Sequence, residues 1–206
     1  MDNKKISVNL TDGLFRQNVV VSSGLAAFPV IAIVTTLKNA IVLSVGFTLI
    51  TVLSVIVSSF ISRKIIYAMR IALFSLVSSV IYIPVALFLR AVFPSVSVNL
   101  GMYLPILVVN SVILSKSESR FHHLSKAMMS FDVLIFCFGF SLAAMLVGAI
   151  REVVAYNTIF DYKINMNFEM ASAAQPFFGF ILIGCLSALT RLIIHKNNPK
   201  LSKEKK

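Results

Sequence analysis

The sequence predicts an all-α integral membrane protein with six transmembrane helices. Of its 206 residues, 58% are hydrophobic and 13% are charged, whereas a soluble domain carries roughly 25% charged residues. The mean hydropathy is +0.90, and a soluble chain of this size would leave too much apolar surface in water. Six windows of 18–25 residues contain no Asp, Glu, Lys or Arg, and a helix needs ~20 apolar residues to cross a bilayer. These windows are 17–37, 39–62, 71–89, 91–115, 133–150 and 170–190.

The same windows divide the chain into a membrane domain and two tails. The domain covers residues 17–194, with halves at about 17–90 and 91–194, between tails at 1–16 and 195–206. Fifteen of the 19 Lys and Arg residues lie in the N-terminal tail, in the second and fourth loops, and at the C-terminal end from Arg191 onward. Because such residues are retained on the cytoplasmic side, both tails are expected in the cytoplasm of a bacterial inner membrane. The net charge of +11 then lies beside lipid headgroups, and no nucleic-acid partner is expected.

Two prolines occupy matching places in the first and fourth windows. Pro29 lies in the segment FPVIAIV and Pro105 lies in LPILVVN. Three spans per half is an odd number, so related halves would have opposite orientations in the membrane. We therefore expect a 3+3 inverted repeat whose first and fourth spans are broken at Pro29 and Pro105, since proline removes a backbone hydrogen bond. The alternative is that proline is common in transmembrane helices without such a role.

Three segments carry a family resemblance. They are the stretch from Gly24 through Pro29 to Asn39, the segment PILVVN at 105–110, and LVGAIREVV at 146–154 followed by NTIF at 157–160. Together they resemble the Rnf/Nqr membrane-subunit family, and the segment GLF at 13–15 is similar to its RnfE/NqrD-like branch. The resemblance implies an integral-membrane component of an ion-translocating electron-transport complex. It also implies a homologous six-helix partner and further subunits in the same bilayer.

The family's cluster ligands are missing from this chain. In the family, a cysteine before the proline of the first span and another after the asparagine of the fourth hold an iron–sulfur centre between two subunits. Those positions are Phe28 and Ser111 here, and neither supplies the thiolate that iron prefers. The resemblance therefore implies that Fe–S and flavin belong to partner subunits and that this chain binds no cofactor. An alternative function is a small-solute or ion transporter or channel subunit without electron transfer.

Five polar residues are candidates for a site at membrane depth. Asp132 is interpreted either as a binding or relay group for a translocated cation or as a residue favoured by the helix dipole near a helix N-terminus. Arg151 and Glu152 are expected to pair with neighbouring groups or a partner subunit, or to anchor the helix end at the interface. Asn39 and Asn110 follow the two prolines, and their amides are expected to satisfy freed backbone groups.

No catalytic residue and no metal site are predicted. His122 and His123 have no companion ligands in the sequence, and a structural zinc site needs about four. Cys137 and Cys185 fall inside predicted spans and are interpreted as small core residues.

Overall fold

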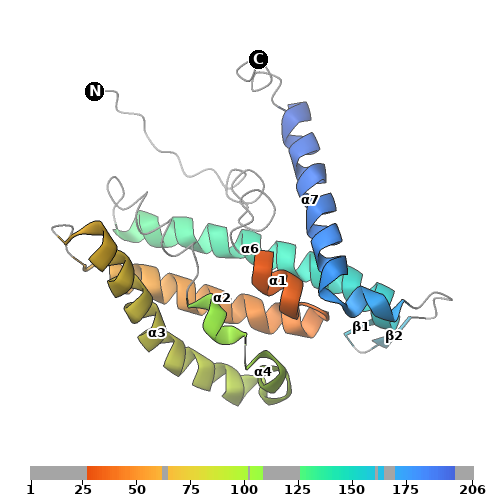
Figure 1. Cartoon of the computed structure of the whole chain (residues 1–206), viewed down its shortest axis with the longest axis horizontal. Helices are drawn as coiled ribbons and strands as arrows, with labels where there is room; N and C mark the ends of the chain where they lie inside the picture. Colours follow the sequence, from red (N-terminus) through yellow and green to blue (C-terminus); the bar gives the residue numbers. More distant parts are fainter. Residues whose placement is uncertain are drawn as a thin grey trace.

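A computed structural model of the chain describes residues 27–61, 65–101, 103–108, 126–160, 162–164 and 170–197. The described part is mostly helical, with two short 3-10 helices and one two-stranded hairpin (Figure 1). The elements are α1 (Ala27–Ile33), α2 (Leu37–Ser58), α3 (Tyr67–Val92), α4 (Pro94–Leu100), η2 (Leu104–Leu107), α6 (Lys126–Tyr156), β1 (Thr158–Ile159), β2 (Tyr162–Lys163), η3 (Ala171–Ala174) and α7 (Pro176–Asn197).

Three predicted spans are confirmed as helices long and apolar enough to cross a bilayer. They correspond to α2, α3 and α6, which match windows 39–62, 71–89 and 133–150. Helix α7 lies in the sixth window, but its apolar part runs only from Pro176 to Thr190. The six-helix count and the inverted repeat depend on further residues outside the described ranges, so they stay predictions.

The first helix is interrupted, but not at Pro29. The helical backbone of α1 continues past Pro29 for four more residues. The helical backbone stops after Ile33 and resumes at Leu37, which leaves Val34–Thr36 as the interruption. The break expected at Pro29 is therefore not confirmed, and the interruption lies one turn further along the chain.

The fourth window is not a single helix in its described part. Helix α4 ends at Leu100, and Pro105 lies in the first turn of the 3-10 helix η2. A helical span broken at Pro105 is not confirmed, and Asn110 and Ser111 lie outside the described residues. A proline does not by itself end a helix in this chain, because α3 continues through Pro84 for 26 residues.

The core forms between α2 and α6, which run side by side in opposite directions (Figure 1). Phe47 of α2 stacks on Phe140 of α6, with ring centroids 3.9 Å apart and an interplanar angle of 20°. Helices α3 and α4 cover another side of α2, where Gly46 approaches Leu89. Helix α7 rises at a steep angle from the end of α6 and contacts α1.

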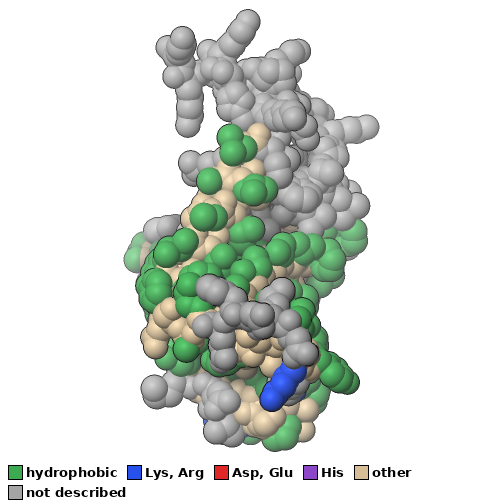
Figure 2. Space-filling model, turned by 90° about the vertical axis from the view of Figure 1, so that its right-hand side faces the viewer, with side chains coloured by type: hydrophobic (Ala, Val, Ile, Leu, Met, Phe, Trp, Pro, Cys, Tyr) green, Lys and Arg blue, Asp and Glu red, His purple; other side chains and the backbone are tan. Residues whose placement is uncertain are grey.

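Large apolar side chains cover much of the outer surface, as expected for a protein that faces lipid. Figure 2 shows many hydrophobic side chains over the described surface on the side of α7, with a basic side chain prominent toward the lower right. Exposed large apolar residues of α3 and α7 include Met69, Leu76, Val80, Ile83, Leu87, Phe177, Phe180, Ile181, Leu189 and Leu192.

A hairpin at the end of α6 returns the chain toward that helix. Asn157 and Phe160 have φ values of 51° and 54°, a backbone region that asparagine tolerates better than most residues. The N–H of Asn157 donates to Val153 O at 3.1 Å, which closes the last turn of α6, and the N–H of Met170 donates to Val154 O at 3.0 Å. The second bond holds η3 beside the C-terminal part of α6.

Candidate functional site

The interruption between α1 and α2 leaves backbone groups that need partners, because helix ends have unpaired carbonyl and N–H groups. Thr36 caps α2: its Oγ1 accepts from the N–H of Asn39 at 3.3 Å. The Asn39 side-chain amide donates to Ile33 O at 3.4 Å and to Thr35 Oγ1 at 3.2 Å. Asn39 thus links the last residue of α1 with the interrupted segment.

Arg151 of α6 donates hydrogen bonds to backbone carbonyls at the α1 end of the interruption. Its side chain is fully buried, and Nη1 donates to Ile31 O and Val34 O, both at 2.8 Å. Nε and Nη2 donate to the chain just before α7, with bonds to Ala173 O (3.2 Å), Ala174 O (2.7 Å) and Gln175 O (3.2 Å). A guanidinium has five N–H groups, so these bonds use all of them. Arg151 therefore joins α1, α6 and the start of α7.

Glu152 binds the other side of the interruption. Its Oε2 accepts from the N–H of Leu37, the first residue of α2, at 2.7 Å, and its Oε1 accepts from Thr158 Oγ1 at 3.4 Å. Two consecutive residues of α6 thus place a cation at the carbonyl end of α1 and an anion at the N–H end of α2. These signs are the ones that the helix dipoles favour.

Gly148 allows α6 to approach this closely. A Cβ at that position would lie 2.9 Å from Val34 Cγ1, 3.0 Å from Ala40 Cβ and 3.1 Å from Thr36 O. The glycine lies one turn before Arg151 on the same helix. We call Gly148, Arg151 and Glu152, together with the interrupted segment Val34–Thr36, the clamp.

Asp132 lies far from the clamp. It is buried at 9% exposure and is the seventh residue of α6, so it does not belong to the first turn, where the helix dipole acts most strongly. Arg151 follows it by nineteen positions along α6, which corresponds to about 28 Å at 1.5 Å per residue. The structure therefore separates Asp132 from Arg151 and Glu152.

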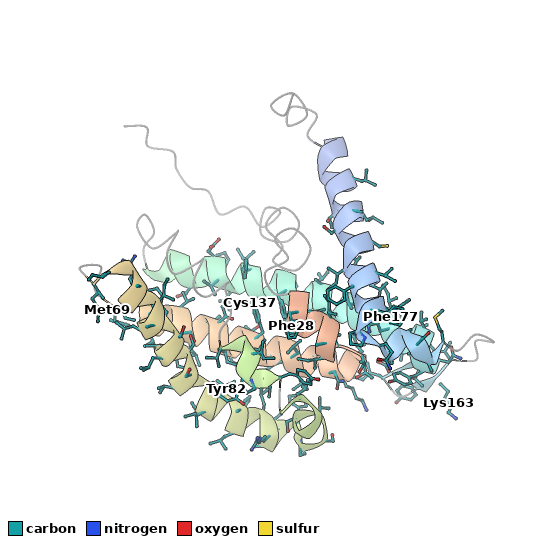
Figure 3. All side chains as sticks on the ribbon, in the orientation of Figure 1. Phe28, Met69, Tyr82, Cys137, Lys163 and Phe177 are labelled. Carbon is teal, nitrogen blue, oxygen red and sulfur yellow. The ribbon has the colours of Figure 1, made fainter. Side chains whose placement is uncertain are left out.

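Of the two positions at which the family carries cluster ligands, the described residues include only the first, Phe28. Phe28 lies on α1 (Figure 3) with 55% of its surface exposed, and its side chain has no ligand atom. Cys137 is buried in α6 and Cys185 is exposed on α7. Within the described ranges, no group of three or more His, Cys, Asp or Glu could hold a metal ion.

Sequence reasoning identified Arg151, Glu152 and Asn39 but missed how they come together. It missed Thr36, and it did not single out Gly148 within the segment LVGAIREVV. It also missed the carbonyls of residues 173–175, for which the sequence has no signal because backbone groups carry none. The segment GAIRE at 148–152 was the available signal, since it combines a close-approach glycine with two charges inside an apolar helix.

Comparison with known proteins gives one family match and relatives that share one name. Residues 6–187 match the family described as "Rnf-Nqr subunit, membrane protein". The chain is 32% identical to the E-type subunit of the ion-translocating oxidoreductase complex of Rhodobacter capsulatus, over 94% of this chain and 85% of that protein. It is 28% identical to the corresponding protein of Shewanella loihica, over 88% of this chain and 84% of that one. With helices α2, α3 and α6 long enough to span a bilayer, the chain belongs to the Rnf-Nqr family of membrane subunits.

Proposed function

We propose that this chain is an integral-membrane subunit of an ion-translocating electron-transport complex of the Rnf/Nqr type. The observation that carries the proposal is the extent of the similarity: relatives named as the E-type component of an ion-translocating oxidoreductase complex match 94% and 88% of the chain. The described helices support it, because three of them have the length and apolarity of membrane spans.

The proposal includes a topology and a partner. Six spans in a 3+3 inverted repeat would place both basic tails in the cytoplasm of a bacterial inner membrane. A homologous six-helix protein would pack beside this chain, together with the other subunits of the complex. The interrupted first helix supports this arrangement, because interrupted helices held inside a protein are a recurrent way to build an intramembrane site.

The chain itself is proposed to bind no iron–sulfur cluster. Phe28, at the first family ligand position, offers only an apolar ring, so iron and flavin would reside on partner subunits. Replacing Phe28→Cys and Ser111→Cys together in the assembled complex is expected to add iron to this chain. Stoichiometric iron already bound to this chain in the unaltered complex would contradict the proposal.

A vesicle experiment tests the function. Membrane vesicles are prepared from cells with the chain and from cells lacking it, and sodium and proton uptake are followed after an electron donor is added. We expect donor-dependent ion uptake only where the chain is present. Ion or solute movement that requires the chain but no electron donor would instead establish a transporter or channel function.

A further inference from the structure

Four hydroxyl groups on α2 are buried without a hydrogen-bond partner among the described residues. They belong to Ser44, Thr51, Ser54 and Ser58, each at most 3% exposed. Native proteins contain few such groups, and each one calls for an explanation such as an ordered water or an ion. The cluster is therefore unusual within a single apolar helix.

Other hydroxyls in the described helices behave differently. Thr48, on the same helix, donates to Ser44 O at 2.8 Å. Ser78 of α3 is also fully buried, and it donates to Phe74 O at 2.9 Å. Ser141 of α6 donates to Cys137 O at 2.9 Å. Bonding to the preceding turn is thus a recurrent arrangement in the described helices, and the four α2 hydroxyls depart from it.

The four hydroxyls share the face of α2 that packs on α6. Ala40 and Phe47 define that face, since Ala40 approaches Gly148 and Phe47 stacks on Phe140. Alternating steps of four and three residues connect these positions along one seam of a helix. The α2 seam comprises Ala40, Ser44, Phe47, Thr51, Ser54 and Ser58.

The residues of α6 that face this seam are mostly apolar and provide few hydrogen-bond partners for the hydroxyls. At the same spacing they are Val133, Cys137, Phe140, Ala144, Val147 and Arg151, all buried. The register set by Ala40 with Gly148 and by Phe47 with Phe140 places Thr51 level with Cys137, whose position on α6 is labelled in Figure 3. Arg151 donates all its N–H groups elsewhere, so it does not serve the hydroxyls.

Buried charges lie toward both ends of this seam. Glu152 binds the N-terminus of α2, and Asp132 is buried near the other end of α6. Ionisable groups at membrane depth mark ion pathways in many membrane proteins. The Phe47–Phe140 stack lies between Ser44 and the other three hydroxyls, where an apolar constriction would act as a gate by excluding water.

We propose that the seam between α2 and α6 is the passage for the translocated cation. The four hydroxyls bind a small monovalent cation and its accompanying water, and the Phe47–Phe140 stack is the narrowest point. The inference rests on the proposed function, because it assigns the route of the ion that the complex moves.

The test compares two double variants of the full complex in proteoliposomes. Thr51→Val with Ser54→Ala removes two unpaired hydroxyls, while Thr48→Val with Ser78→Ala removes two hydroxyls already bonded to their own helices. Electron transfer is measured with an ionophore present, and the sodium or protons moved per electron are measured without it, using a radioactive sodium tracer and a pH-sensitive dye. We expect the first variant to move about fivefold to tenfold fewer ions per electron, since each hydroxyl contributes a bond to the ion. The control should match the parent complex in both measurements.

A failure of the proposed function and a failure of the proposed passage give different results. A parent complex that moves no ions on electron transfer overturns the proposed function. A normal parent complex with equal ratios in the two double variants overturns the passage alone.

A labelling experiment tests the hydration of the seam independently of electron transfer. Ser54→Cys and Ser78→Cys are compared for reaction with a small thiosulfonate, which needs a hydrated thiolate. We expect Ser54→Cys to react about tenfold faster. Equal rates, after subtraction of the reaction of the parent chain, would overturn the passage.

Discussion

Replacing Arg151 with lysine should destabilise the chain although the positive charge remains. Lysine has three N–H donors and arginine has five, so at least two of the five carbonyls bound by Arg151 lose their partner. A hydrogen bond to a charged group contributes about 1.5–3 kcal/mol, which gives a loss of about 3 kcal/mol or more in the free energy of unfolding. At about 2–4 °C per kcal/mol for a chain of this size, the melting temperature should fall by about 6–12 °C.

Cys137 provides the readout, because its thiol is buried in α6. The exposed Cys185 is first replaced by serine. Unfolding of the detergent-purified chain is then followed with a bulky dye, which is too large to enter the folded seam between α2 and α6 and fluoresces on reaction with the newly accessible thiol. Arg90→Lys is the matched control, since Arg90 lies exposed in the last turn of α3. Equal melting temperatures for Arg151→Lys and Arg90→Lys would refute the idea that the five bonds hold the clamp together.

Three further predictions use the same assay or a local one. Gly148→Ala should lower the free energy of unfolding by about 1–3 kcal/mol through overpacking, because the added Cβ would meet Thr36 O and two side-chain atoms. Gly184→Ala, where a Cβ would meet nothing within 4 Å, should be neutral or stabilising. Equal effects of the two variants would contradict the close approach of α6 at Gly148. Glu152→Gln should speed hydrogen exchange at the Leu37 amide, because a charged acceptor is lost from a 2.7 Å bond, and unchanged exchange there would exclude this cap. Phe140→Ala should lower the free energy of unfolding by about 3–5 kcal/mol. Phe138→Ala, which removes an exposed side chain of the same helix, should lower it far less. Similar losses for the two variants would argue against the stacked core.

Much of the helical framework follows from the sequence. Charge-free windows of the right length became α2, α3 and α6, because an apolar segment in a bilayer must satisfy its backbone internally and a helix does so. The windows are set by composition alone, so they need no knowledge of tertiary contacts.

The place of the interruption could not be predicted in the same way. Pro29 was the local signal, yet the helical backbone of α1 continues past it to Ile33. The interruption at Val34–Thr36 depends instead on Arg151 and Glu152, which are more than 100 residues away along the chain. Only the folded chain brings those groups together.

The hydroxyls of the α2 seam follow a pattern in the sequence that the sequence analysis did not use. Ser44, Thr51 and Ser58 recur at intervals of seven residues, which places them on one face of a helix. Their lack of partners could not be foreseen, because it depends on which residues α6 presents across the seam.

The proposed place of this chain in an electron-transport complex is tested most directly by gentle extraction from its native membrane. Partner proteins are identified by mass spectrometry, and iron and flavin are assayed in the same sample and again after this chain is separated from its partners. We predict co-purification with flavin- and Fe–S-bearing subunits and no iron on the separated chain. A chain that purifies alone, without partners, flavin or iron, would contradict its place in such a complex.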